Sequence, residues 1–262
     1  ALYGGNLESA ITLSDRALET ARGSTRGELL VLQLRTMGIR NEPFKMTPLC
    51  REALQLVETG SSSWFQALAG LTSAGTWGGD PVALLEALQA LQEFSGDLKP
   101  IAPMGLAGNM LCDSLQHIGQ RDQATAIFRR LESSNSEEHC GAVDPVFSGW
   151  LDLTRVNRAL LGNEPMSTSL PSARGALAHF EDACDVVGST IAKGALGWTL
   201  LEHGDPVGAE SYVRESLEQA IALEIPIGVG FSTLFMGYVH IASGQFREAL
   251  VIMEPLLELD NP

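Results

Sequence analysis

Apolar residues recur at steps of three and four along most of the chain, which is the spacing of one face of an amphipathic α-helix. No alternation of apolar and polar residues typical of a β-strand stands out, so the expected fold class is all-α. The pattern predicts helices over residues 7–21, 49–57, 81–94, 106–118, 122–131, 146–161, 173–187, 192–202, 207–223, 228–242 and 246–259.

Polar and turn-forming residues separate these helices. The breaks fall at residues 41–48, 59–63, 95–103, 133–145 and 163–172. The last two are the longest, and we interpret 133–145 and 163–172 as irregular surface insertions. No change of composition is strong enough to divide the chain, so a single domain is expected over residues 1–262.

The segment Gly-Asp-Pro-Val occurs twice, at residues 79–82 and 204–207. Aspartate is favoured as the N-cap of a helix, and proline is favoured at the first helical position. Both segments therefore predict a helix start, and their identity is the first sign of an internal repeat.

A glycine followed five residues later by an alanine marks a longer repeat. The glycines of these pairs are Gly5, Gly78, Gly119, Gly204 and Gly244. Successive glycines are separated by about forty residues or by about twice that length, so each long step is expected to hide one degenerate unit. With hidden units at 49–57 and 173–187, the chain contains about seven units of two helices each.

The spacing has a direct physical interpretation. A tight turn between two antiparallel helices needs a residue that tolerates positive φ, and the following helix packs closely only through a small contact residue. Gly197 and Gly237 each lie seven residues before a turn glycine, inside a helix, where glycine costs up to about 1 kcal/mol relative to alanine. A cost repeated at the same position indicates a close approach of two helices.

This pattern resembles the tetratricopeptide repeat (TPR), whose helix A carries W-x2-L-G-x2-Y and whose helix B carries A-x3-F. The Leu-Gly pairs at 196–197 and 236–237 match the first motif, and Ala124 with Phe128 matches the second. The units are longer than the 34 residues of the family. Other departures are Val213 and Met253 for the Phe, Leu200 and His240 for the Tyr, and Lys193 and Thr233 for the Trp.

The resemblance implies a right-handed superhelical solenoid of antiparallel helix pairs, with the helix A faces lining a concave groove. The repeat pattern is similar to the long, divergent repeats in sensor regions of bacterial signalling proteins. The family's groove positions fall here on Asn109, Asp113, Gln116, His117, Asp152, Trp198, Glu202 and Tyr238.

Each of these positions has an alternative interpretation. Residues such as Trp198 and Tyr238 more often pack between repeats than contact a ligand, and residues such as Asp113 and Glu202 are more often solvated. Asn109 would also serve to bond a neighbouring backbone. The four polar residues on one helix at 109–117 are the stronger indication, because a helix buried on both sides would carry them only at a cost.

The sequence contains no motif that points to catalysis. The P-loop, the G-x-G-x-x-G loop, H-E-x-x-H and G-x-S-x-G are absent, and no two histidines are three or four residues apart. Thr190 and Lys193 have the spacing of S-x-x-K without its companion motifs, and His139–Cys140 is an isolated neighbour pair. We therefore expect no enzymatic activity, no cofactor and no metal.

Charge and cysteine usage limit the partners and the compartment. The net charge is −15, and no basic stripe suited to nucleic acid is present. The acidity fits either a solvated surface or an acidic groove for a basic partner.

No apolar run is long enough to cross a membrane. The four cysteines form no close pair, which favours free thiols in the cytoplasm, with Cys50, Cys112 and Cys184 expected to be buried.

The leading functional hypothesis is an interaction or sensor module of a larger signalling protein, binding a peptide or a partner domain in the concave groove. The alternative is a small-molecule effector domain that regulates an attached kinase, ATPase or transcription domain. Both ends lack a polar capping helix, so the chain is expected to be a piece of a longer protein, with self-association through the terminal helices as a further hypothesis.

Overall fold

The computed structural model describes residues 7–40, 42–96, 100–135 and 143–257, and these residues contain helices and no β-strand. Packing divides the chain into two compact units, Ala1–Leu151 and Asp152–Pro262, with the division inside α9 (Pro145–Leu160). The all-α fold class is confirmed, while the single domain over 1–262, the solenoid and its repeat count stay predictions. None of the described helices has the length and apolar character needed to span a bilayer.

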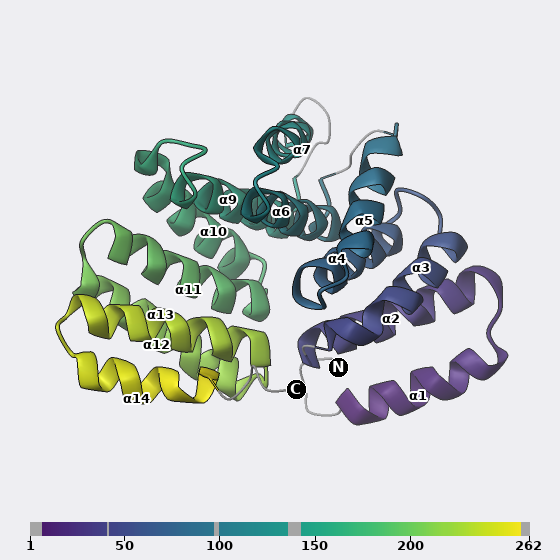
Figure 1. The fold of residues 1–262 in the computed structure, drawn as a ribbon. Helices are drawn as coiled ribbons and strands as arrows, with labels where there is room; N and C mark the ends of the chain where they lie inside the picture. The colour runs from purple at the N-terminus through teal and green to yellow at the C-terminus, as the bar shows by residue number, and fades with distance from the viewer. Residues whose placement is uncertain (1–6, 41, 97–99, 136–142, 258–262) are drawn as a thin grey trace. The chain divides into compact units, whose positions relative to one another are not determined.

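In the first unit, most helices pack against a neighbour in sequence (Figure 1). The helix α4 also contacts both α2 and α6, whereas α5 makes little contact with α6, so the alternate helices α2, α4 and α6 form an inner layer. The helices are α1 (Leu7–Thr20), α2 (Gly23–Arg40), α3 (Met46–Leu56), α4 (Ser62–Trp77), α5 (Pro81–Glu93), α6 (Ala102–His117) and α7 (Arg121–Ser134), with a short 3-10 helix η1 (Pro43–Lys45) before α3.

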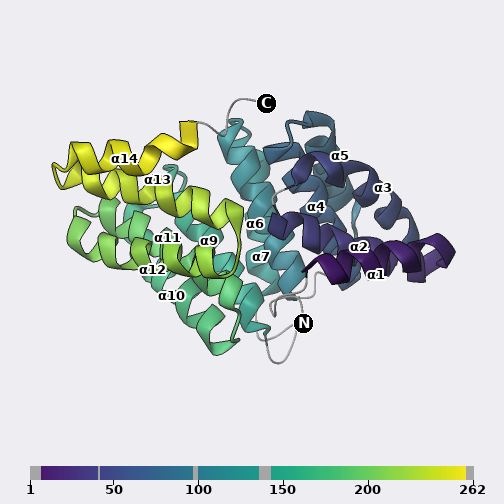
Figure 2. The ribbon, with the colours of Figure 1, turned by 90° about the horizontal axis from the view of Figure 1, so that it is seen from below.

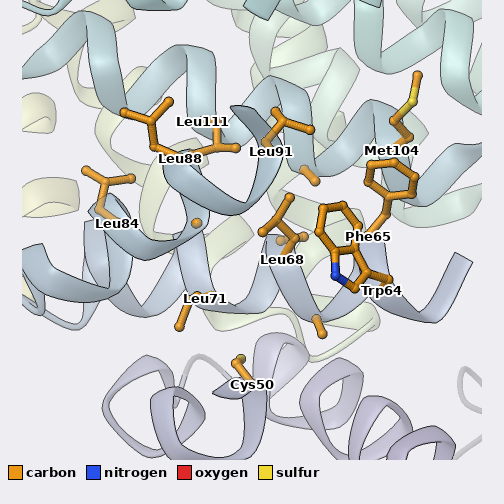
Figure 3. Packing of buried hydrophobic residues seen from close by; sticks show 14 of the residues in the cluster. Cys50, Trp64, Phe65, Leu68, Leu71, Leu84, Leu88, Leu91, Met104 and Leu111 are labelled. Carbon is orange, nitrogen blue, oxygen red and sulfur yellow. The ribbon is translucent and has the colours of Figure 1, made fainter. Parts of the chain in front are cut away.

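The core of the first unit is built around α4 (Figure 3). Trp64 and Phe65 of this helix pack edge to face at 5.0 Å, and Phe94 closes over both rings. Cys50 of α3 is fully buried, and this burial raises the pKa of its thiol to about 12, so the group packs as a small apolar side chain. Figure 3 also shows Leu68 and Leu71 of α4, Leu84, Leu88 and Leu91 of α5, and Met104 and Leu111 of α6.

In the second unit, consecutive helices again lie side by side, and α11 also contacts α13 (Figures 1 and 2). The helices after α9 are α10 (Ser169–Asp182), α11 (Val186–Glu202), α12 (Pro206–Ala222), α13 (Pro226–Ala242) and α14 (Phe246–Leu257), and a 3-10 helix η2 (Met166–Thr168) precedes α10. The core of this unit joins Leu196 and Leu200 of α11, Val213 of α12, and Met236 and Val239 of α13.

One turn geometry connects the helices of the second unit. Cys184, Gly204, Glu224 and Gly244 all have positive φ and are spaced twenty residues apart. The next residue donates its backbone N–H to the carbonyl five residues earlier, as Asp205 does to Leu200 at 2.9 Å. This bond satisfies a carbonyl at the helix end, as in a Schellman motif.

The same turn explains why the sequence repeat is twice as long as the backbone repeat. Glycine occupies the positive-φ position at 204 and 244, whereas Cys184 and Glu224 occupy it with φ of 53°. A residue with a side chain in this region costs about 1–2 kcal/mol. The prediction that Cys184 is buried is wrong, because the turn holds it at the exposed end of α10. Cys50 and Cys112 are buried as expected.

The close helix approach expected at Gly197 and Gly237 is confirmed. A Cβ on Gly197 would meet Val213 of α12 as well as the carbonyl oxygen of Ala209, the latter at 3.1 Å. A Cβ on Gly237 would meet the Met253 side chain of α14. Contact residues without side-chain bulk therefore set the spacing of both helix pairs.

The repeat unit that begins with Gly78 has a different register from that expected. Gly79, with φ of 68°, is the positive-φ residue of the turn between α4 and α5, while Gly78 has a φ of −87°. The close contact lies at Gly75, where a Cβ would be 2.7 Å from the backbone nitrogen of Leu84. The turn between α4 and α5 contains one additional residue, which shifts by one position the spacing between the turn glycine and the contact residue of the next helix.

Several predicted boundaries also differ from those observed. The expected helix list omitted α2 and α4, and the helix predicted over 173–187 ends at Asp182, before the turn at Cys184. The segment 163–172 contains η2 and the start of α10, and 133–145 begins within α7. Residues 136–142 of that insertion and Gly5 lie outside the described residues, and Pro145 at its end begins α9.

Candidate functional site

Four candidate residues lie on α6 in the first unit, and two of them face inward. Asn109 and Gln116 are buried, at 9% and 7% exposure. The Gln116 Nε2 donates to the carbonyl oxygen of Cys112 on the same helix at 3.1 Å. These two amides therefore belong to the helix packing and are not displayed as a binding surface.

Asp113 and His117 form the outward part of this set. The side chain of Asp113 is 25% exposed and that of His117 is 60% exposed, with 3.6 Å between Asp113 Oδ1 and His117 Nδ1. Partial burial raises the pKa of the Asp113 carboxyl, and the nearby His117 ring opposes that rise. The pair therefore places a partly buried carboxylate beside an imidazole ring near the C-terminal end of α6.

We expect Asp113→Asn to stabilise the chain at neutral pH and to have little effect in acid. Because the folded-state pKa lies above the reference value of 3.8, the native state holds this proton to higher pH than the unfolded chain. The stability contribution is therefore complete below 3.8 and is lost as the pH rises through the folded-state pKa. The difference in unfolding free energy between variant and wild type, measured in urea at several pH values, should grow with pH.

The control is Glu218→Gln, which neutralises an exposed carboxylate on α12. This variant shows how much of the difference comes from removing one surface charge. A profile for Asp113→Asn that matches that of Glu218→Gln would show that burial of the Asp113 carboxylate does not affect stability.

Asp152 of α9 is held by neighbours in the second unit. Its Oδ1 accepts a hydrogen bond from Arg155 Nη1 at 2.7 Å, and its Oδ2 lies 3.7 Å from His179 Nε2 on α10. The side chain is only 14% exposed, and burial raises the pKa of the carboxyl against the effect of Arg155 and His179. Asp152 therefore links α9 to α10, and this structural role uses both of its oxygens.

Trp198 and Tyr238 are brought together, with ring centroids 5.4 Å apart across α11 and α13. Phe235 lies 4.6 Å from Trp198, and Phe231 lies 6.1 Å from Phe235. Phe231 and Tyr238 remain more than a third exposed, at 39% and 37%. We call these four residues the aromatic face; it packs two helices together and also presents ring surface to solvent.

The sequence prediction missed Phe231 and Phe235, although a signal was present. Together with Tyr238 they recur at steps of four and three along α13, which places all three on one side of the helix. Glu202 is exposed on α11, one turn beyond Trp198, as a groove position would require. The aromatic face therefore has a carboxylate on the same helix as its tryptophan.

Among the described residues, no group of three or more histidine, cysteine, aspartate or glutamate residues could hold a metal ion. A shallow depression of the second unit is lined by Glu181, Cys184, Val186, Ser189, Lys193 and Gln219. The Lys193 amine in it is 3.0 Å from Glu215, so its charge is already paired.

Comparison with known proteins gives no match to a protein-family model and none to a curated protein.

Proposed function

We propose that this chain is a TPR-like interaction module that binds a peptide segment of a partner protein on the aromatic face of α11 and α13. The observation that carries the proposal is the contact between Trp198 and Tyr238, two predicted groove residues, with exposed ring surface beside it. Solenoids of helix pairs present their inner helices as extended binding surfaces. The inner position of α11 and α13 is supported by their mutual contact, which skips α12.

Aromatic side chains are well suited to this role. Tryptophan and tyrosine dominate binding hot spots because they bury a large area with few rotatable bonds. The rings of Trp198, Phe235 and Tyr238 support one another edge to face, so little side-chain freedom is lost when a ligand covers them. An apolar or aromatic anchor of the peptide would pack against this surface.

The surrounding charge favours a basic residue beside that anchor. Glu202 lies one turn from Trp198, and the whole chain has a net charge of −15. A lysine or arginine of the peptide would meet both the face of an aromatic ring and a carboxylate. This is the acidic-groove interpretation of the charge, applied to one helix pair.

The proposal extends to the context of the chain. The repeat pattern resembles sensor regions of signalling proteins, so peptide binding would report the state of a partner to attached domains in a cytoplasmic protein without chemistry of its own. The effector alternative gains no support from the depression at Lys193, because that depression is open to solvent and lined in part by charged groups.

The test is a selection of peptides from a random display library on the wild-type chain, followed by titration of the selected peptides. We expect Tyr238→Ala and Trp198→Ala each to weaken binding by about thirtyfold, since a hot-spot aromatic contributes about 2 kcal/mol or more. Glu202→Lys should selectively weaken peptides that carry a basic residue, and this loss should shrink at high salt.

The matched control is Phe246→Ala, which removes an exposed aromatic ring on α14, outside the aromatic face. Circular dichroism of all variants must match the wild type. Peptides that bind every variant with equal affinity would contradict the proposal, and so would peptides that lose binding only in the control.

A further inference from the structure

The outer surface of α14 carries an apolar pair between two opposite charges. Leu250 and Val251 are 67% and 63% exposed, and Arg247 and Glu254 are also exposed. The four residues recur at steps of three, one and three, so they lie on a single face of the helix. We call them the α14 face.

The corresponding surface of α12 shows that this composition is particular to α14. Forty residues earlier, at the same place in the backbone repeat, Glu210 and Ser211 stand where α14 has Leu250 and Val251. On α12, Arg214 forms an ion pair with Glu210 one turn away. On α14, Leu250 replaces Glu210 and Glu254 replaces Arg214, so neither partner of that ion pair is kept at these positions.

The order of residues on the α14 face is complementary to itself when reversed. In an antiparallel pair of identical helices centred between positions 250 and 251, Arg247 lies opposite Glu254 of the second copy, and Glu254 lies opposite its Arg247. The same symmetry places Leu250 against Val251. Two ion pairs then flank an apolar centre, so the surface has the self-complementarity that a twofold interface requires.

We propose that the α14 face is a homodimer interface in which α14 packs antiparallel against α14 of a second copy. A parallel pairing would oppose Arg247 to Arg247 and Glu254 to Glu254, and like charges disfavour it. Phe246 is 68% exposed beside the face and adds apolar area at its edge. One helix per copy buries less surface than stable dimers do, so the dimer belongs to the weak, transient class.

The inference is independent of peptide binding at the aromatic face. It is tested by sedimentation of the wild-type chain over a wide range of concentration, which should show a reversible shift from monomer to dimer. Arg247→Glu and Glu254→Arg should each weaken the dimer by about tenfold, because each replaces two attractive contacts with two repulsive ones. The double charge reversal should restore the wild-type affinity.

Mixing the two single variants gives the sharpest result. Arg247→Glu carries two acidic residues on the face and Glu254→Arg carries two basic ones, so the mixture should form a heterodimer more readily than either variant dimerises alone, as native mass spectrometry would show. Leu250→Glu/Val251→Ser, which copies the α12 surface, should be monomeric with unchanged circular dichroism.

Three outcomes would overturn the proposal. The first is a wild-type chain that stays monomeric at every concentration. The second is a dimer whose affinity is indifferent to both charge reversals, and the third is a dimer that survives the Leu250→Glu/Val251→Ser change.

Discussion

Gly197→Ala is expected to lower the free energy of unfolding by about 2 kcal/mol, although alanine is the better helix former. The added Cβ would meet the branched side chain of Val213 and the backbone of α12, including the Ala209 carbonyl oxygen at 3.1 Å. Neither group moves without displacing the helix, because Val213 is itself fully buried. Urea unfolding followed by circular dichroism measures the change.

Two matched glycines separate crowding from helix propensity. Around Gly230 of α13 nothing lies within 4 Å of an added Cβ, so Gly230→Ala should stabilise the chain by about 0.5–1 kcal/mol. Gly237→Ala should cost less than Gly197→Ala, because the Met253 side chain that it meets is flexible. If the variants at 197 and 230 had equal effects, the close approach of α11 and α12 would not be what requires glycine.

Phe180→Ala is expected to cost about 3–5 kcal/mol, the largest effect of any single change considered for this chain. The side chain is fully buried in the second unit, on α10. Its ring lies against Gly188 in the first turn of α11, where an added Cβ would overlap the ring carbons. Deleting the ring leaves a cavity at the point where α10 and α11 pack together.

The same contact predicts a reversal of sign in a double-mutant cycle. Gly188→Ala alone should destabilise the chain, because its methyl group competes with the Phe180 ring for one space. In the Phe180→Ala background the methyl group enters the cavity, and Gly188→Ala should become neutral or stabilising. Additive effects of the two changes in urea unfolding would show that the two residues do not compete for this space.

Helix periodicity located most helices but missed α2 and α4. In α4 the buried residues include Phe65, Ala67, Ala69, Gly70 and Leu71, which lie on several sides of the helix. A helix covered on several sides has no polar stripe, so its apolar pattern lacks the contrast that a period of 3.6 requires. The helix α14 keeps that contrast, and the Asp-Pro segment at 205–206 marks the start of α12, which is why both helices were predicted closely.

The turns were predictable only where glycine occupies them. Gly204 and Gly244 marked the repeat, whereas Cys184 and Glu224 adopt the same backbone conformation with residues that carry no turn signal. At these two positions the packing of the helices outweighs the residue's own conformational preference. The turn hydrogen bond still forms, as from the Ile225 N–H to the Ala220 carbonyl oxygen at 2.9 Å. The sequence therefore indicated every second turn of the second unit.

The candidate site was predicted in part for a similar reason. Position along a helix identified Trp198 and Tyr238 as equivalent groove positions, because both follow a glycine of the same repeat, and the structure shows that their rings are in contact. It could not distinguish them from Asn109 and Gln116, which the packing of α6 turns inward. Exposure depends on which neighbouring helices cover a face, and a single helix pattern does not contain that information.

The twenty-residue turn spacing also bears on how such a chain can change over evolutionary time. The backbone requires one residue per helix that tolerates positive φ, and it requires a small side chain where two helices meet. Even the turn position accepts cysteine and glutamate. Most other positions need only preserve an apolar or polar character, so substitutions can accumulate at them while the architecture persists. In a protein of this kind we therefore expect the spacing of the turns to persist longer during evolution than the identity of individual residues.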